Sequence, residues 1–170
     1  LEFRRVLFRS IKQANALKMQ IDVSHMNEKA FWDTAHHSTS PLVATHSNAH
    51  ALCPQPRNLT DEQLRAIRDS GGVVGVNFGN AFLRADGKRD SDTPLRTIVH
   101  HIDYLINIMG DDHVALGSDF DGITLPDELG DVSGLPRLIN ALRHSGYEQL
   151  VLDKLLWGNW QKVLKNVWQQ

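Results

Sequence analysis

The sequence has 170 residues with a formal net charge of −2, and hydrophobic residues make up 41% of it. A chain of this length can bury one substantial core, and its composition is ordinary for a globular protein. The small net charge argues against nucleic-acid binding, which needs a basic face, and there is no run of about 18 apolar residues that would predict a membrane span. Cys53 is the only cysteine, so the segment has no internal disulfide, whereas nine histidines make the placement of the imidazoles informative.

The first ten residues, LEFRRVLFRS, are basic and amphipathic. The sequence after them is polar and does not supply the apolar region and small-residue cleavage site of an export signal. The same ten residues are the translation of the 3′ end of a common short-read sequencing adapter. We therefore expect residues 1–10 to be non-native, residues 11–170 to be the protein segment proper, and the natural protein to extend further towards its N-terminus.

Strand and helix patterns alternate along the rest of the chain. Short apolar stretches predict strands at positions 19–23, 41–45, 73–77 and 113–119. Amphipathic stretches between them predict helices at positions 11–18, 27–38, 60–72 and 93–110, and two or three further helices follow the last strand. Trp157, Trp160 and Trp168 fall in these last helices, where we expect them to pack in the core.

Three of the predicted helices begin with recognisable capping residues. Asn27 is suited to cap the helix that follows it, and Thr60 with Gln63 forms the pattern of a capping box. Thr93 is predicted to cap the next helix, with Pro94 at the first helical position. These signals place the helix starts directly after strand ends or loops.

Alternating apolar strands and helices predict an α/β fold with a parallel sheet, in which helices cover buried strands. The sequence does not favour an open doubly wound sheet, because no glycine-rich phosphate loop follows the first strand. A (β/α)8 TIM-type barrel needs about 250 residues. The sequence therefore predicts the C-terminal half of such a barrel, about four βα units plus C-terminal helices.

Polar residues follow strand after strand: His25, His46, Asn77 and Asp119. In a parallel barrel these positions share one face, which is where the chemistry of such barrels gathers. Imidazole and carboxylate are ligands that suit zinc, and neighbouring strands lie about 4.8 Å apart. His25 and His46 could thus reach the same pair of metal ions, although a histidine at a strand end is also often a structural residue.

Four separated blocks carry a more specific signal: IDVSHM, ATHSNAHALCPQPRNLTDEQL, VGVNF and ALGSDFDG. In this order they resemble the membrane dipeptidase (renal dipeptidase) family of zinc metallopeptidases, within the amidohydrolase-like barrels. The resemblance runs from Ile11 to the end of the chain, including WGNWQKVLKNV, which is similar to the closing helix of that family. It implies a dipeptidase that uses two zinc ions and a metal-activated bridging water.

The resemblance also implies roles for individual residues. His25 and His46 would be zinc ligands, and Arg57 would hold the substrate carboxylate, for which a guanidinium fork is suited. Asp119 would line the site and contact the substrate or the catalytic water, acting as both catalytic and substrate-binding residue. Asp121 would hold the loop or a neighbouring ligand in place. An H-x-D pair, a bridging glutamate and a further histidine of the family do not occur in this segment.

The remaining histidines have simpler interpretations. We expect His36 and His37 to lie near a helix C-terminus, His113 at the start of a strand, and His100 and His101 to face solvent or a neighbouring helix. His50 shares a loop with Arg57 and is a weaker candidate for substrate contact. Cys53 lies in the same loop, where a buried apolar role is favoured over a nucleophilic one.

Two alternatives stay open from the residues alone. One is another barrel hydrolase, such as a lactonase or deaminase, and the other is a binding barrel without catalysis.

With only two imidazoles for two metal ions, we expect this segment alone to be inactive and prone to pair through its open sheet edge. The sequence leaves the compartment undecided, whether cytoplasmic or exported, and a homodimer of the intact protein stays open.

Overall fold

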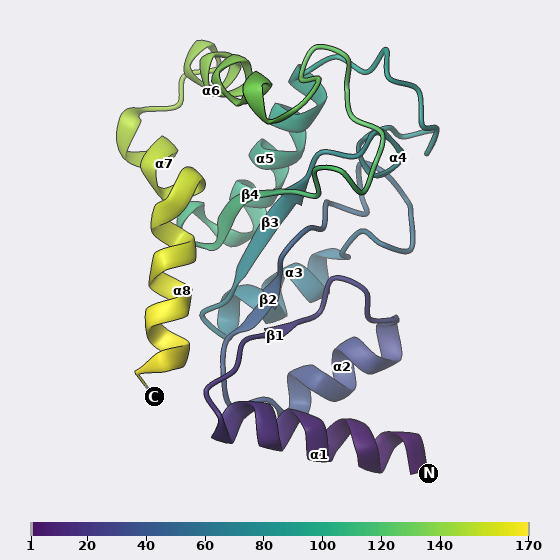
Figure 1. Ribbon diagram of the computed structural model, residues 1–170, viewed down its shortest axis with the longest axis vertical. Coiled ribbons are helices and arrows are strands. Elements are labelled where there is room, and N and C mark those ends of the chain that lie inside the picture. The colour runs from purple at the N-terminus through teal and green to yellow at the C-terminus, as the bar shows by residue number, and fades with distance from the viewer. Residues whose placement is uncertain (1, 170) are drawn as a thin grey trace.

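Four parallel strands form a single sheet in the computed structural model, which describes residues 2–169 and the side chains from Arg5 onward (Figure 1). The strands are β1 (Ile21–Asp22), β2 (Leu42–Ala44), β3 (Val73–Asn77) and β4 (Val114–Ser118). Their order in the sheet is β1-β2-β3-β4, so each strand pairs with the next one along the chain. This order is the one expected for consecutive βα units of a barrel.

Helices connect and follow these strands. They are α1 (Glu2–Ala16), α2 (Glu28–His37), α3 (Asp61–Asp69), α4 (Asn80–Leu83), α5 (Arg96–Met109), α6 (Leu135–His144), α7 (Gln149–Asp153) and α8 (Asn159–Trp168). Short turns lie at Asp111–His113 (η1), Val132–Gly134 (η2) and Lys154–Gly158 (η3), the last of them a π-helical turn that joins α7 to α8. Among the described residues, no helix has the length and apolar character needed to cross a bilayer.

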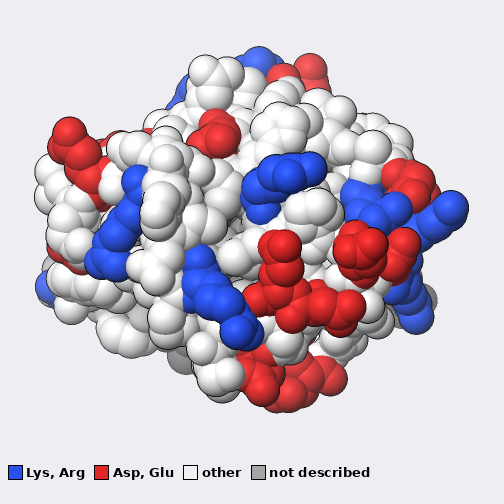
Figure 2. Space-filling model, turned by 90° about the horizontal axis from the view of Figure 1, so that it is seen from above, with Lys and Arg blue, Asp and Glu red and all other residues white. Residues whose placement is uncertain are grey.

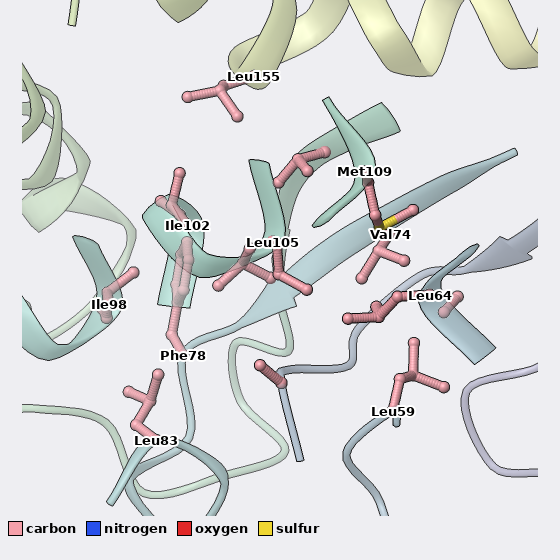
Figure 3. Packing of buried hydrophobic residues seen from close by; sticks show 14 of the residues in the cluster. Leu59, Leu64, Val74, Phe78, Leu83, Ile98, Ile102, Leu105, Met109 and Leu155 are labelled. Atoms are coloured by element: carbon pink, nitrogen blue, oxygen red, sulfur yellow. The ribbon is translucent and has the colours of Figure 1, made fainter. Parts of the chain in front are cut away.

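The main core lies between the sheet and helices α3 and α5. Alternate strand residues, such as Val74 and Val114, point to this face and pack with Leu64 of α3 and with Ile102 and Leu105 of α5. Figure 3 shows Val74 of the sheet with Leu64, Ile102 and Leu105 of the two helices, and Phe78 and Leu83 extend the cluster towards the loop after β3. The sheet face is thus buried by amphipathic helices, as the sequence predicts.

The opposite face of the sheet contacts α8. Val43, Val73 and Ala115 point to this side and pack with Val163 and the partly buried Trp160. The prediction that all three C-terminal tryptophans lie in the core is wrong for two of them. Trp157 and Trp168 are 56% and 58% exposed. Trp157 lies in η3, before α8, and Trp168 lies outside the buried stripe of α8, which Asn159, Val163 and Val167 define.

The helix caps mostly follow the sequence pattern. Asn27 accepts a hydrogen bond from the backbone N–H of Ala30, and Thr60 with Gln63 forms the capping box. Thr93 does not cap α5, which begins two residues after Pro94. Its hydroxyl instead donates to the carbonyl of Asp90, which closes a turn before the helix.

Two glycines let the chain leaving β2 lie close over the neighbouring strands. A Cβ atom at Gly75 or at Gly117 would lie 2.1 Å from the carbonyl oxygen of Thr45. Only glycine leaves this space free, so β3 and β4 admit the backbone that carries His46. The backbone N–H of Ser47 also donates to the carbonyl of Gly75, which holds this close approach.

Candidate active site

The loops that follow the strands surround a cavity of about 530 Å³. Its lining includes His25, Arg57 and Asp119, together with Gly79, Asn80, Ala81, Phe82, Arg89, Asp121, Gly122, Ile123 and Thr124. Figure 2 shows the molecule from above, relative to Figure 1, and acidic and basic side chains are intermixed on this face. This cavity collects three of the four site residues predicted from the sequence, and His46 lies directly beside it.

His25 and His46 bring their ring nitrogens together. The two Nε2 atoms are 2.9 Å apart, and the ring centroids are 5.0 Å apart with the planes tilted by 56°. Two nitrogen ligands of a tetrahedral zinc ion lie about 3.3 Å apart. The two imidazoles therefore converge in a way that fits shared ligation of one cation, with only a small outward adjustment of the rings.

The surroundings of His46 favour its neutral form. Burial lowers the pKa of His46 most, and the nearby Arg57 charge adds to this, while Asp119 and Asp22 act in the opposite direction. The net effect is a pKa below the ordinary value of histidine. A metal ligand must offer an unprotonated nitrogen, so this environment suits ligation.

The guanidinium of Arg57 lies beside the two imidazoles. Its Nη2 atom is 3.4 Å from Nε2 of His25 and 3.5 Å from the carbonyl oxygen of His46. Its Cζ atom lies 5.7 Å from the ring centroid of Phe82, a cation–π contact. The Nη1 atom of Arg57 is buried and has no hydrogen-bond partner among the described residues. The guanidinium, which lines the cavity, therefore retains an unpaired N–H donor.

Asn58, next to Arg57, fixes the loop that carries the guanidinium. Its Nδ2 atom donates to the carbonyls of Cys53 and Phe82, and the backbone N–H of Leu59 donates to the carbonyl of Asn48. The Cys53 thiol is fully buried, and burial raises its pKa, so it has a packing role here. Arg57 thus extends from a loop that is tied down by buried amides.

Asp119 enters the cavity from a turn with unusual backbone angles. Ser118, Asp119 and Asp121 all have positive φ values, at 47°, 70° and 65°. Such angles are unfavourable for residues other than glycine and often occur at functional sites. Asn77 donates from Nδ2 to Oδ2 of Asp119 over 2.9 Å, and its own Oδ1 accepts from the backbone N–H of Gly79. The end of β3 therefore orients the carboxylate at the end of β4.

The other candidates are placed elsewhere. His50 and Arg57 both line a second, smaller cavity of about 240 Å³ beside α2. His101, which was expected to face solvent or a neighbouring helix, is buried and contacts the carbonyl of Leu83 in α4 and the backbone N–H of Ala49 in the loop after β2. His113 pairs through Nδ1 with the carbonyl of Gly72, away from the cavity. Within residues 2–169, no three His, Cys, Asp or Glu side chains form a cluster able to hold a metal.

Several residues that shape the site were not identified from the sequence. Asp22 binds Thr45, the neighbour of His46, and Asn48 binds Asn77, whereas Phe82 and Arg89 line the cavity. Asp22 lies within the quoted IDVSHM block, and Asn48 within the second block, so their position next to the two histidines was the available signal. Phe82 and Arg89 lie in the loop after β3 and carry no local pattern.

A parallel sheet whose carboxyl edge brings two imidazoles, a guanidinium and a carboxylate together has the organisation of a metal-dependent barrel hydrolase. The chain belongs to the membrane dipeptidase family, peptidase family M19, whose model matches residues 9–170.

Known proteins and structures resemble the chain over most of its length. An uncharacterized protein in the pqqA 5′region of Klebsiella pneumoniae is 91% identical over 160 residues, covering 94% of this chain and 59% of that protein. The crystal structure of the dipeptidase AC, a family M19 metallopeptidase, has a TM-score of 0.94 at 48% identity, covering 96% of this chain and 48% of that one. The crystal structure of a Rhodobacter sphaeroides metallopeptidase, liganded with a phosphinate mimic of the dipeptide L-Ala-D-Ala, has a TM-score of 0.93 at 49% identity. This match covers 95% of this chain and 46% of that chain.

The chain thus spans about half the length of the proteins it matches. Its α/β fold corresponds to about half of the M19 barrel dipeptidases, in agreement with the prediction of a C-terminal barrel half. Membership of this family favours a peptidase over the lactonase and deaminase alternatives.

Proposed function

We propose that the intact protein is a zinc-dependent dipeptidase, which hydrolyses the peptide bond of dipeptides. The observation that carries this proposal is the convergence of the His25 and His46 Nε2 atoms, 2.9 Å apart, with the Arg57 guanidinium 3.4 Å from His25. A cation site beside a guanidinium suits a small substrate that has both a carbonyl to polarise and a free carboxylate to bind. The family membership and the peptidase neighbours support it.

The residues of this chain take distinct parts in the proposal. His25 and His46 would hold zinc, of which the intact enzyme would contain two ions. When bound, zinc would supply the activation of a bridging water and the polarisation of the scissile carbonyl. Arg57 binds the C-terminal carboxylate of the dipeptide, and Asp119, oriented by Asn77, positions the free amino group or the attacking water. Hydrolysis adds water across the amide, so the carbonyl carbon gains the oxygen and the leaving nitrogen gains a proton.

The Arg57 clamp also limits substrate length. Because the guanidinium lies beside the two imidazoles, a carboxylate bound to it places the preceding peptide bond close to them. A longer peptide would place an uncharged amide where the carboxylate belongs. The proposed site therefore favours dipeptides with a free C-terminus.

Substitution of Arg57 tests the clamp in the intact zinc-loaded protein. The wild type is expected to hydrolyse a dipeptide about 100-fold more efficiently, in kcat/KM, than its C-terminal amide, because a charge-assisted hydrogen bond is lost with the amide. Arg57→Gln should remove most of this preference, and Arg57→Lys should retain part of it, because lysine keeps the charge without the fork. An Arg57→Gln protein with an unchanged preference would contradict the clamp, and no hydrolysis of any dipeptide by the wild type would contradict the proposed function.

We also propose that residues 1–170 alone are inactive, and that residues 1–10 contribute nothing to the site. Only two imidazoles and no third metal-binding side chain come together within residues 2–169, whereas catalytic zinc normally has three protein ligands. The isolated chain should therefore show no dipeptide turnover above background with added zinc. Measurable turnover that saturates with zinc would overturn this expectation.

A further inference from the structure

The side chain of Asp22, at the end of β1, is held in one orientation by three donors. Its Oδ1 atom accepts from the backbone N–H groups of Ser24 and Thr45, both at 3.0 Å, and its Oδ2 atom accepts from the hydroxyl of Thr45 at 2.6 Å. Burial would raise the pKa of the Asp22 carboxyl, but these hydrogen bonds outweigh it and keep the pKa below its ordinary value. An ionised carboxylate has no proton to donate, so the direction of each hydrogen bond is fixed.

The Thr45 hydroxyl has one proton, and it is committed to Asp22, whose oxygen is much closer than the Ser24 hydroxyl at 3.5 Å. The Thr45 oxygen also lies 2.7 Å from Nδ1 of His46. Because the hydroxyl donates to Asp22, it can only accept from the imidazole, so the proton of neutral His46 must be on Nδ1. The Nε2 atom then carries a lone pair, and in the metal-free protein it accepts from an Nε2–H of His25 across 2.9 Å.

The backbone around this chain of hydrogen bonds is also fixed. The N–H of His46 donates to Oγ of Ser24 over 3.1 Å, and the Thr45 carbonyl lies in the space left by Gly75 and Gly117. Thr45 and His46 therefore have little freedom to move apart and break the contact between Oγ1 and Nδ1.

We propose that Asp22 and Thr45 are positioning residues that hold His46 as its Nδ1–H tautomer and thereby present an unprotonated Nε2 atom to a divalent cation. The use of this tautomer for zinc rests on the proposed function, whereas the tautomer itself does not. Outer partners of this kind commonly fix the orientation and basicity of a metal-binding histidine. Here the carboxylate acts through a hydroxyl instead of contacting the imidazole directly.

Asp22→Asn is the sharpest variant, because it keeps the shape of the side chain and reverses only its hydrogen bond with the Thr45 hydroxyl. The oxygen of the new side-chain amide would keep the two backbone N–H groups, which places its NH₂ group against the Thr45 hydroxyl. That hydroxyl would then accept from the amide and donate to Nδ1 of His46, so the imidazole proton would move to Nε2. Thr45→Val removes the hydroxyl at similar volume, and Thr45→Ser retains it.

Two measurements on the intact protein test the proposal. Imidazole ¹⁵N chemical shifts of the metal-free protein at neutral pH report the tautomer of His46, and competition with a chromogenic chelator reports zinc affinity. Wild type and Thr45→Ser should show Nδ1–H. Asp22→Asn should shift to Nε2–H, and both Asp22→Asn and Thr45→Val should bind zinc about 10–100-fold more weakly. Thr45→Ser should bind within about threefold of wild type, because its hydroxyl makes the same contacts.

A wild-type protein with Nε2–H on His46, or an Asp22→Asn protein that keeps both Nδ1–H and full zinc affinity, would overturn the proposal. The wild-type spectrum identifies the tautomer even where a variant does not fold. Failure of the proposed function has a different appearance: the wild type would show the Nδ1–H tautomer, but it would bind no zinc or hydrolyse no dipeptide.

Discussion

His101 is a buried imidazole that joins a loop of the candidate site to α4 without lining the cavity. Its Nδ1 atom accepts from the backbone N–H of Ala49 over 3.3 Å, and its Nε2 atom pairs with the carbonyl of Leu83 over 3.0 Å. Because Nδ1 accepts and a carbonyl can only accept, His101 is neutral with its proton on Nε2. It thereby ties the loop that carries Arg57 to α4.

Burial, the largest cause, lowers the pKa of His101 to about 4, from 6.5. In the unfolded chain the imidazole binds a proton near pH 6.5, so between these two pH values the unfolded state holds more protons than the folded state. The contribution of His101 to the free energy of unfolding is therefore fully present above about pH 6.5. It is lost as the pH falls towards 4, and this loss is at most about 3 kcal/mol.

Urea unfolding of the intact protein between about pH 7.5 and 4.5 measures this loss. His101→Gln cannot take up a proton, so its free energy of unfolding should be lower at neutral pH but should fall less steeply with acid. Equal slopes for the variant and the wild type would show that His101 does not carry the pH dependence.

Helix α8 is attached to the sheet by side chains that donate to backbone carbonyls of β4 and of η1, the turn before it. Asn159 donates from Nδ2 to the carbonyls of Asp111 and Val114, both at 2.7 Å, and Trp160 donates from Nε1 to the carbonyl of Leu116 at 3.0 Å. Val114 and Leu116 are alternate residues of one strand, so their carbonyls point to the same side. The helix thus satisfies polar groups of β4 and also packs against the sheet face.

Asn159→Asp keeps the size of the side chain but replaces the donor with an anion that faces two carbonyl oxygens. We expect it to lower the free energy of unfolding by about 3 kcal/mol or more, because a buried charge is left unpaired and two acceptors lose their donor. The matched change at the exposed Gln161, to Glu, should cost less than about 0.5 kcal/mol. Chemical denaturation compares the two, and similar small losses would contradict this description of how α8 is held.

The elements were predictable where the signal is local. The alternation of apolar strands and amphipathic helices, the Asn27 cap and the capping box at Thr60 depend on residues a few positions apart, and the structure shows them. The start of α5 was not predictable from Thr93 and Pro94, because Glu128 binds the backbone N–H of Leu95 from 33 residues away and fixes the preceding turn.

The same distinction applies to the site. Strand-end positions made His25, His46 and Asp119 candidates, because parallel strands end on one face. The partners that orient them come from far along the chain: Asn77 reaches Asp119 across 42 residues, and Asp22 reaches Thr45 across 23. No periodicity or motif spacing reports such contacts, so they required the structure.

For the molecule as a whole, the two imidazoles, the guanidinium and the carboxylate lie at one edge of a sheet that corresponds to about half of the M19 dipeptidases. The chain supplies one pair of candidate ligands and the proposed carboxylate clamp. Further ligands and the proposed second zinc ion would then depend on the part of the intact protein that these relatives have in addition.

The most direct test is an anomalous difference map, measured at the zinc absorption edge, from crystals of the intact protein grown with zinc. We predict a peak about 2.1 Å from the Nε2 atoms of both His25 and His46, with Arg57 beside it. A zinc peak that contacts only one of the two imidazoles, or no peak between them at saturating zinc, would contradict the claim that they share one cation.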